Sequence, residues 1–268
     1  MDMVLVDGKK IASNVAEQVF VEIKENKFSP KMVVITCDPN FETKKYLSLK
    51  QSKAEALGIE LEIIILSSES DTKTVIETIK NKSSEVDGII VQLPLPKHID
   101  TKIILQAIPK ELDVDVFSYN GDDLNILPPV IGAIDEISNF HQVAWKDKKV
   151  VIFGSGRLVG APAEKYAHEK GSQVVVLNKE SKDSKEFILN ADIVILGVGK
   201  PNLLTPEMVK DDVVVFDAGA SEDGGLLVGD ASPLVAEKAK LFTPVPGGIG
   251  PITIAVLFRN LVELKKRQ

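Results

Sequence analysis

An apolar run leads directly into a glycine-rich turn in the middle of the sequence: Val150-Val151-Ile152-Phe153-Gly154-Ser155-Gly156-Arg157-Leu158-Val159-Gly160-Ala161-Pro162. The run predicts a buried strand, and the pattern after the turn predicts a helix. In such a unit the first glycine permits a tight turn, the second lets a pyrophosphate approach the backbone, and the helix N-terminus stabilises negative charge. The segment therefore predicts a dinucleotide site, with a structural glycine-rich turn as the alternative.

The same alternation of short β-branched runs and longer helical patterns extends over the whole chain. We predict strands at Met32–Thr36, Leu61–Leu66, Gly88–Leu93, Val150–Phe153, Val174–Leu177, Ile193–Leu196 and Val213–Phe216. We predict helices at Lys9–Glu25, Thr43–Leu57, Lys73–Lys82, Ile131–Phe140, Gly160–Lys170 and Ile252–Lys266. Strands that are apolar on both faces and alternate with helices are typical of parallel, doubly wound sheets of the α/β class.

The length of 268 residues suits two domains better than one. Turn residues interrupt the periodicity around Asp115 to Pro129, which predicts a boundary there. The last helix, beyond Pro251, is one element too many for the second sheet, so we expect it to return to the first lobe. The predicted domains are residues 1–118 with 251–268, and residues 119–250, the latter a Rossmann-type NAD(P)-binding domain.

Composition narrows the class of protein. Hydrophobic residues make up 44% and charged residues 26% of the chain, as in ordinary globular proteins. The net charge of −7 offers no general attraction to nucleic acid or anionic lipid. The single cysteine, Cys37, cannot form an internal disulfide, and no apolar stretch approaches the roughly 18 residues of a membrane span. We expect a cytoplasmic protein without nucleic-acid or membrane partners.

The residues after Val174–Leu177 bear on the choice of dinucleotide, because the end of this strand should meet the adenosine ribose. Lys179 would accommodate the extra phosphate of NADP, with Ser155 and Ser181 as possible hydroxyl donors. The neighbouring Glu180 leaves NAD as an alternative cofactor. The alternative without a ligand is that Lys179 is a solvated surface lysine. The sequence favours NADP.

Three polar positions in the first lobe are candidates for chemistry. Tyr46 and Lys50 stand four residues apart on one helix face. Gln92 falls at the carboxyl edge of an apolar strand, where open α/β sheets bind ligands. Asp115 either enters the same site or caps a turn. A Tyr/Lys pair with this spacing is by itself most often a solvated surface pair.

A proline- and glycine-rich segment, Thr243–Thr253, precedes the last helix and is called the proline-glycine segment below. It holds three prolines and three glycines in Thr-Pro-Val-Pro-Gly-Gly-Ile-Gly-Pro-Ile-Thr. Proline fixes φ and glycine opens conformations that other residues avoid. Such a segment is typical of backbone held rigidly against a flat ligand, and a plain connector is the alternative.

Taken together, these motifs resemble one family, the bifunctional methylenetetrahydrofolate dehydrogenase/methenyltetrahydrofolate cyclohydrolases. The resemblance rests on Tyr46–Lys50, Val91–Pro96, Asp113–Asp115, Gly154–Pro162, Gly199–Pro201, Val228–Asp230 and Thr243–Thr253, which run in the family's order over nearly the whole chain.

The resemblance implies a folate bound in a cleft between the lobes and two activities. NADP would oxidise methylenetetrahydrofolate without a metal, and the methenyl product would be hydrolysed to formyltetrahydrofolate. Lys50 would serve the hydrolysis, Tyr46 would stack near the pterin, Gln92 would tune the lysine and Asp115 would hold the pterin. The implied substrate contacts also include Val91, Leu93, Pro246, Gly247, Gly248, Ile249 and Gly250, and the implied dinucleotide contacts are Gly154, Ser155, Gly156, Lys179 and Ala220.

The resemblance also implies a homodimer formed through the second sheet, for which the apolar strand Val174–Leu177 is an edge candidate. Three positions depart from the family pattern. Val116 replaces a usual glycine, and a β-branched residue disfavours positive φ, which predicts a differently shaped turn. Leu127–Val130 alters a loop between the lobes, and Gly156 replaces a common serine.

Three alternatives stay open at this point. One is a monofunctional dehydrogenase that has lost the hydrolytic step. Another is a non-catalytic regulator that binds folate or a nucleotide, against which the combination of Lys50, Gln92 and Asp115 argues. The third is an unrelated two-lobed NADP dehydrogenase for a shikimate-like acid, which leaves the proline-glycine segment unexplained.

Overall fold

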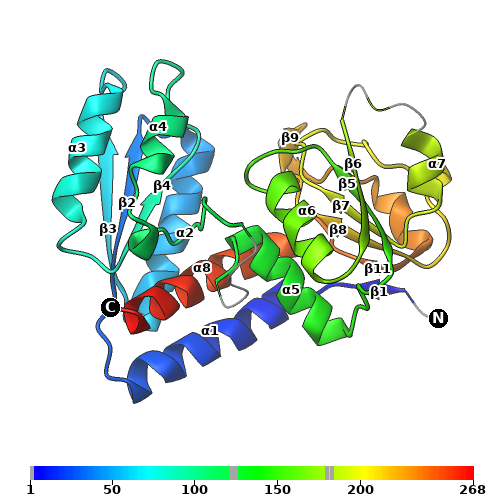
Figure 1. The fold of residues 1–268 in the computed structure, drawn as a ribbon, viewed down its shortest axis with the longest axis horizontal. Coiled ribbons are helices and arrows are strands. Elements are labelled where there is room, and N and C mark those ends of the chain that lie inside the picture. The colour runs from blue at the N-terminus through cyan, green and yellow to red at the C-terminus, as the bar shows by residue number, and fades with distance from the viewer. Residues whose placement is uncertain (1–2, 121–125, 179–180, 182–183) are drawn as a thin grey trace. The chain divides into compact units, whose positions relative to one another are not determined.

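The computed structural model of the chain describes residues 3–120, 126–178, 181 and 184–268, with only the backbone of residues 41 and 42. Two compact units emerge from it. The six-stranded unit combines Met1–Ser13 with Tyr119–Val256, and the three-stranded unit combines Asn14–Ser118 with Leu257–Gln268. The boundaries fall inside the first helix, α1 (Gly8–Glu25), and the last, α8 (Ile249–Lys266), which are drawn in blue and red in Figure 1.

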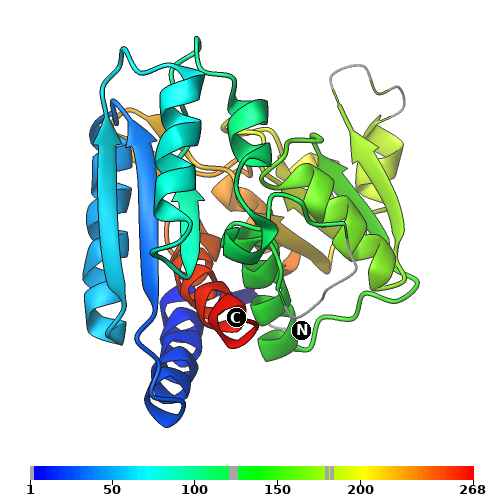
Figure 2. The same ribbon diagram turned by 60° about the vertical axis from the view of Figure 1, so that its left-hand side comes forward.

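The three-stranded unit is built on a parallel sheet with β2 (Lys31–Cys37) between β3 (Glu60–Leu66) and β4 (Gly88–Val91). Its helices are α2 (Phe41–Leu57), α3 (Thr72–Lys82) and α4 (Thr101–Gln106), with a 3₁₀ turn, η1, at Lys110–Leu112. Figures 1 and 2 show α3 and α4 on one face of this sheet and α2 on the other. Both faces are covered, which explains why all four residues of β4 are buried.

Polar caps define where these helices begin. Asn40, Asp71 and Asp100 each accept a hydrogen bond from the backbone N–H three residues further on. Such caps satisfy an N–H group that has no partner inside the helix. Gly58 ends α2 in the left-handed conformation, with a φ of 73°. The caps at Asn40 and Asp71 begin two helices that the sequence predicts, whereas the short helix α4, which follows Asp100, was not predicted.

The C-terminal part of α8 packs in the three-stranded unit. The amide of Asn260 donates to the carbonyl of Val114 over 3.1 Å, and both residues are buried. Leu261 lies so close to Gly88 that a Cβ on the glycine would be 2.6 Å from its Cδ1. The predicted return of the last helix to the first lobe is thus confirmed.

The six-stranded unit holds a wholly parallel sheet in the order β1-β11-β8-β7-β5-β6. The strands are β1 (Val4–Leu5), β5 (Lys149–Phe153), β6 (Gln173–Leu177), β7 (Ile193–Leu196), β8 (Val213–Asp217) and β11 (Ala239–Phe242). The chain first adds β6 on one side of β5 and then β7 on the other. The order therefore reverses at β5, and ligands of open α/β sheets bind at such a reversal.

Helices and short turns cover the six-stranded sheet. They are α5 (Pro129–His141), α6 (Gly160–Glu169) and α7 (Ser184–Leu189), with the 3₁₀ turns η2 (Pro206–Met208) and η3 (Pro233–Glu237). An antiparallel hairpin is formed by β9 (Ser221–Asp223) and β10 (Leu226–Val228). Beneath α6, Trp145 stacks on Phe216 and meets the edge of Tyr166, at centroid distances of 5.8 and 5.1 Å.

The parallel α/β class and the two sheets are as predicted, and each predicted strand is present with small shifts at its ends. The first residues differ from the expected grouping. Val4 pairs with Leu241, and Val6 donates to the carbonyl of Phe242 over 2.9 Å, so residues 1–13 cluster with the six-stranded unit. A strand of two residues has no period to recognise, which is why the sequence did not predict it.

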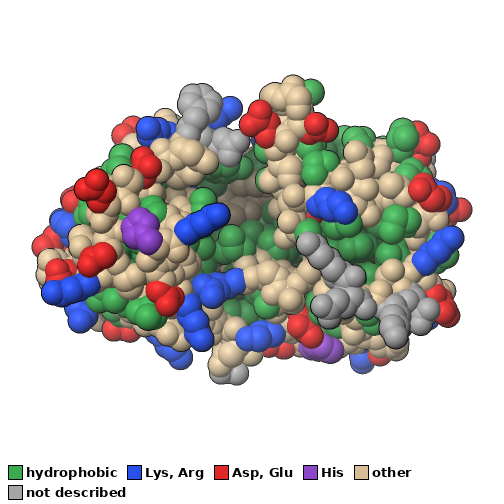
Figure 3. Space-filling view, turned by 90° about the horizontal axis from the view of Figure 1, so that it is seen from above, with side chains coloured by type: hydrophobic (Ala, Val, Ile, Leu, Met, Phe, Trp, Pro, Cys, Tyr) green, Lys and Arg blue, Asp and Glu red, His purple; other side chains and the backbone are tan. Residues whose placement is uncertain are grey.

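The face shown in Figure 3 carries both Lys and Arg and Asp and Glu side chains. In the ion pairs Lys31–Glu60 and Lys73–Glu77 both side chains are well exposed to solvent, and such pairs contribute little to stability. Within the described residues, no helix has the length and apolar character needed to cross a membrane.

Candidate active site

The Lys50 amine and the Gln92 amide meet at the carboxyl edge of the three-stranded sheet. Lys50 lies on α2 and is only 9% exposed, while Gln92 directly follows β4. Lys50 Nζ donates to Gln92 Oε1 over 2.8 Å, and Gln92 Nε2 donates in turn to the carbonyl of Leu93 over 3.0 Å. This chain of hydrogen bonds fixes the position of the amine and the orientation of the amide.

Burial and a nearby carboxylate act on Lys50 in opposite directions. Burial lowers the pKa of Lys50, because the ammonium loses water, and the charge of Asp115 opposes that decrease. Burial likewise raises the pKa of Asp115, and the charge of Lys50 opposes that increase. The two side chains therefore form a coupled pair in which the amine loses its proton more readily than a solvated lysine.

A tight turn from Asp113 to Phe117 presents Asp115. The backbone of Asp113 forms a parallel bridge with Ile89 of β4, and its carboxylate Oδ2 accepts the N–H of Phe117 over 2.8 Å. Asp113 is 5% exposed, and its Oδ1 has no hydrogen-bond partner among the described residues. Burial, and secondarily the charge of Asp115, raises the pKa of Asp113 to about 7.

Val116 occupies the strained position of this turn. Its φ is 54°, and its N–H donates to the carbonyl of Asp113 over 3.2 Å. The left-handed conformation costs a residue with a Cβ roughly 1–2 kcal/mol. The expectation that valine would avoid positive φ here is wrong, because the hydrogen bonds at both ends of the turn hold the backbone in this conformation.

The other predicted contacts of this unit differ in exposure. Tyr46 lies one turn before Lys50 on α2 and is 43% exposed, so its ring is open to a stacking partner. Val91 is 1% exposed and belongs to the core beneath α3 and α4. Leu93 is half-buried against the same core. The side chain of Val91 is therefore not exposed to a ligand.

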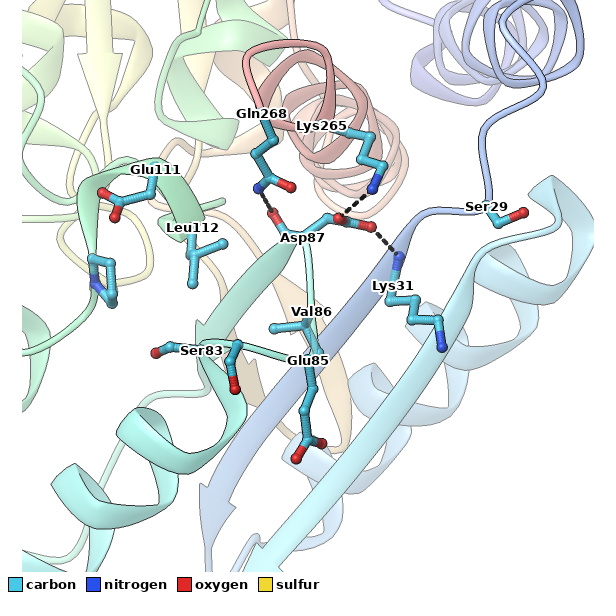
Figure 4. Close-up of a pocket in the computed structure, with 12 residues that line it drawn as sticks. Ser29, Lys31, Ser83, Glu85, Val86, Asp87, Glu111, Leu112, Lys265 and Gln268 are labelled. Carbon is cyan, nitrogen blue, oxygen red and sulfur yellow. Dashed lines mark hydrogen bonds and ion pairs between the residues drawn. The ribbon is translucent and has the colours of Figure 1, made fainter.

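A cavity of about 450 Å³ lies elsewhere, at the amino-terminal edge of the same sheet. Figure 4 shows Asp87 among the lining residues, with its carboxylate bonded to the backbone N–H of Lys31 and to the side chain of Lys265. Asp87 accepts the Lys31 N–H over 2.8 Å and pairs with the Lys265 amine over 2.7 Å. These contacts anchor α8 to the sheet, and parallel sheets bind ligands at the opposite edge. We therefore place the candidate site at Lys50 and not in this cavity.

In the six-stranded unit, the glycine turn after β5 has the geometry of a dinucleotide site. Gly154 has a φ of 81°, and a Cβ on Gly160 would lie 2.0 Å from the carbonyl oxygen of Gly154. The helix α6 thus begins directly against the turn. Apart from its two chain neighbours, no atom of the described residues would lie within 4 Å of a Cβ on Gly156, and Ser155 is exposed, so a phosphate has room to approach.

Other predicted dinucleotide contacts are less well defined. Ala220 is exposed after the end of β8. Lys179 lies outside the described residues. Asn178, at the end of β6, donates its N–H to Ser181 Oγ over 2.9 Å. The residues present at the turn after β5 fit a dinucleotide without any contribution from Lys179.

The proline-glycine segment belongs to the six-stranded unit as far as Thr253. Its Pro246 and Gly250 are exposed, whereas Gly248 and Ile249 are buried. Gly247 has a φ of 107°, and the Gly248 N–H donates to the carbonyl of Pro244 over 2.7 Å. The segment is therefore a tight turn with its own hydrogen bonds, which then starts α8.

Sequence reasoning missed the partner of this segment, Gly8. The Gly8 N–H donates to the carbonyl of Gly247 over 3.0 Å, and a Cβ on Gly8 would lie 1.9 Å from the carbonyl oxygen of Gly248. Only glycine permits this approach. A lone glycine at the start of a helix carries no sequence signal of a contact 240 residues away.

Models of two protein domains match the sequence. Residues 6–115 match the catalytic domain of tetrahydrofolate dehydrogenase/cyclohydrolase, and residues 128–268 match its NAD(P)-binding domain. The "Bifunctional protein FolD" of Nautilia profundicola is 36% identical over 277 residues, which cover 98% of each chain. The "Bifunctional protein FolD" of Staphylococcus aureus is 34% identical over 275 residues, covering 98% of this chain and 96% of that one.

Solved structures agree over the full length. The bifunctional FolD methylenetetrahydrofolate dehydrogenase/cyclohydrolase of Campylobacter jejuni superposes with a TM-score of 0.94 at 31% identity, covering 100% of both chains. The methylenetetrahydrofolate dehydrogenase-cyclohydrolase of Trypanosoma brucei, solved with NADP and an inhibitor, has a TM-score of 0.91 at 26% identity and covers 100% of this chain and 99% of that one. Matches to both domain models, in order and over almost all residues, carry one conclusion: the chain belongs to the tetrahydrofolate dehydrogenase/cyclohydrolase family.

Proposed function

We propose that this protein oxidises methylenetetrahydrofolate to methenyltetrahydrofolate with NADP and hydrolyses the methenyl product to formyltetrahydrofolate. One observation supports the hydrolytic half above all: a buried Lys50 amine, 2.8 Å from the Gln92 amide oxygen and paired electrostatically with Asp115. A pure binding protein has no need for a buried amine with a lowered pKa. The arrangement thus favours an enzyme over a regulator, and it favours the bifunctional enzyme over a dehydrogenase alone.

In the hydrolytic step, water adds to the cationic methenyl carbon. A carbon–nitrogen bond of the bridge then opens as the hydroxyl of the adduct becomes the formyl carbonyl and its proton passes to the leaving nitrogen. The neutral Lys50 amine accepts the proton that the attacking water loses, and the proton later passes to solvent. Gln92 Oε1 accepts a hydrogen bond from Nζ and holds the amine in place, while Asp115 balances the ammonium that forms. Such proton transfer typically contributes about 10²- to 10⁴-fold to a rate.

The remaining residues would position the substrate. Tyr46, exposed on α2, offers a ring on which the flat pterin can stack. The carboxylate of Asp115 would accept hydrogen bonds from the donor edge of the pterin. We also propose that the backbone of residues 246–250 contacts the folate, because this turn combines exposed positions with a backbone that its own hydrogen bonds make rigid.

For the oxidation, the dinucleotide would bind at Gly154–Gly156, where the open backbone and the start of α6 suit a pyrophosphate. NADP supplies the hydride acceptor when it is bound. The chain's own contribution would be to position the folate and the nicotinamide for hydride transfer, since the folate nitrogen stabilises the cation that forms. NADP is the proposed cofactor on the sequence position of Lys179, with NAD as the alternative.

The direct test incubates purified protein with methylenetetrahydrofolate and either NADP or NAD, and follows reduced nicotinamide and methenyl absorbance separately. Reduced nicotinamide should form faster with NADP, without lasting accumulation of methenyl product. An absence of reduction with both cofactors would refute the dehydrogenase.

A pair of variants tests the hydrolysis. Lys50→Met should lower methenyl hydrolysis by about 10²-fold or more and let the methenyl product accumulate while NADP is still reduced. Lys53→Met is the matched control, because Lys53 is an exposed lysine on the same helix. Unchanged hydrolysis in Lys50→Met would remove Lys50 from the mechanism.

We further propose that the protein works in the cytoplasm as a homodimer joined through the six-stranded unit. β6 is an outermost strand with β5 as its neighbour, and residues 174–176 are only half-buried. The mass of one chain is 29.1 kDa, and light scattering coupled to size-exclusion chromatography should give twice this mass. A monomer at micromolar concentration would contradict the dimer, and cell fractionation tests the compartment.

A further inference from the structure

Asp230 places a buried carboxylate against the loop that follows β7. The residue is 0% exposed. Three consecutive backbone N–H groups, those of residues 198–200, donate to its two oxygens over 2.7, 3.2 and 2.6 Å. Hydrogen bonds to an ionised acceptor are the strong ones, and three on one side chain fix the backbone of the loop.

A second buried carboxylate holds the first. Asp217, at the end of β8, is 2% exposed. It accepts the N–H groups of Gly219, Asp230 and Ala231 over 2.9, 3.1 and 2.8 Å. Burial raises the pKa of Asp217 to about 6, although these backbone donors oppose the increase. Through the N–H groups of Asp230 and Ala231, Asp217 fixes the backbone from which Asp230 extends.

Two glycines show how closely the loops surround these carboxylates. A Cβ on Gly219 would lie 2.3 Å from the carboxylate carbon of Asp230. A Cβ on Gly229 would lie 2.2 Å from Asp217 Oδ2. A side chain at Gly219 or Gly229 would displace one of the two carboxylates, so the arrangement requires glycine at both positions.

The loop held by Asp230 lies beside the glycine turn after β5. The strands β5 and β7 are neighbours, and the strand order reverses at β5, with β6 on its other side. A Cβ on Gly154 would lie 3.3 Å from Val198 Cγ2, which places Val198 of the loop against the turn. The N–H groups of residues 198–200 are occupied by Asp230, so this loop can serve a ligand through its shape and not as a phosphate-binding nest.

We propose that Asp230 is a positioning residue for the dinucleotide, holding residues 198–200 in the shape against which the cofactor binds, with Asp217 as its support. This inference rests on the proposed dehydrogenase function. Asp230 does not touch the reacting atoms and acts only through the loop. The coupling is confined to the six-stranded unit, whereas Lys50 belongs to the other unit.

The test compares Asp230→Asn with the wild type. The amide keeps the size of the carboxylate, loses its charge and presents a donor to the backbone N–H groups. The dissociation constant for NADP, measured by calorimetry without folate, should rise about tenfold or more. Hydrolysis of added methenyltetrahydrofolate needs no dinucleotide and should stay within about twofold of the wild type, since a local loop change does not reach Lys50.

Asp192→Asn is the matched control. Asp192 accepts the Lys149 N–H over 2.9 Å at the opposite, amino-terminal edge of the same sheet. This variant alters a carboxylate–backbone bond and the ion pair with Lys210 in the same unit, and it should leave NADP binding unchanged. Wild-type NADP affinity in Asp230→Asn would overturn the proposal, and so would equal losses of NADP binding and hydrolysis. Failure of the wild type to bind NADP would instead refute the proposed function.

Hydrogen exchange on the wild type provides a second measurement if Asp230→Asn does not fold. The amides of residues 198–200 should exchange slowly both without NADP and with it, because Asp230 protects them in either state. Rapid exchange without NADP, slowed only by the cofactor, would show that the dinucleotide orders the loop and would overturn the role of Asp230.

Discussion

Replacing Val116 by glycine and, separately, by alanine tests the backbone strain in the turn that presents Asp115. Val116 has a φ of 54°, in the region that glycine adopts freely and β-branched residues avoid. Both replacements remove the valine side chain beyond Cβ, so its lost packing is common to the two variants. The difference between them isolates the cost of placing a Cβ in this conformation.

The expected difference follows from two opposing terms. The left-handed conformation costs a residue with a Cβ roughly 1–2 kcal/mol, which glycine does not incur. Glycine in turn lowers the free energy of unfolding by about 0.4–1 kcal/mol, because the unfolded chain has more conformational freedom at a glycine. Val116→Gly should therefore be more stable than Val116→Ala by about 0.8 kcal/mol. In most positions the order is the reverse.

Cys37 provides an assay specific to this part of the molecule. It is the only cysteine in the sequence, is 2% exposed and ends β2 in the three-stranded unit. Labelling of its thiol as a function of urea measures the free energy of unfolding of that unit. Fluorescence of Trp145, the only tryptophan, reports separately on the six-stranded unit and should not differ between the variants.

Val21 supplies the control position. It is 44% exposed within α1 and belongs to the three-stranded unit, so the same thiol reports on it. In a helix interior, alanine is more stable than glycine by about 1 kcal/mol. The two positions should thus show opposite orders. If Val116→Ala is as stable as Val116→Gly while the Val21 pair behaves normally, the strain argument is wrong.

Three further predictions concern the proton equilibria and the tight contacts of the site. The pKa of Asp113 is raised to about 7 in the folded state, whereas the unfolded state loses this proton above about pH 4. The contribution of Asp113 to stability is therefore present at low pH and is lost as pH rises through 7. Asp113→Asn cannot titrate and should gain about 2 kcal/mol relative to the wild type between pH 5 and pH 8 in urea unfolding followed by circular dichroism; a constant difference would contradict the assignment. Gly8→Ala should lower the stability of the six-stranded unit by about 2–3 kcal/mol, measured by Trp145 fluorescence, because its Cβ would lie 1.9 Å from a carbonyl oxygen of the proline-glycine segment. The rate of methenyl hydrolysis at saturating substrate should increase with pH, and the midpoint of this increase should lie below the usual lysine pKa, because burial lowers the pKa of Lys50. In Asp115→Asn the midpoint should move to still lower pH. An unchanged midpoint would show that the carboxylate does not act on the amine.

The α/β class could be predicted from the sequence because its signals are local. β-branched runs, helical periods and glycine turns act over a few neighbouring residues, and each is written in consecutive positions. The caps at Asn40 and Asp71 and the turn at Gly154 have the roles that their residue types favour. The candidate residues Lys50, Gln92 and Asp115 were recognisable by their resemblance to a family, which identifies residue types but not distances.

Contacts between distant residues depend on the order of the strands, which local patterns do not specify. The Lys50 amine meets Gln92 across 42 residues because α2 and the end of β4 converge at one edge of the sheet. Gly8 meets the proline-glycine segment because the two-residue β1 adds to β11. Asp230 reaches back 30 residues to the loop after β7.

Val116 shows the same division at the level of one residue. The intrinsic preference of valine predicted a negative φ, yet Asp113 and the bond from Asn260 to Val114 fix the surrounding chain and outweigh it. Local preferences of about 1–2 kcal/mol are smaller than the combined hydrogen bonding and packing of a buried turn. Residue types and their spacing therefore establish which elements form and which groups are available for chemistry, whereas the packing of distant segments establishes how those groups meet and how strained they are.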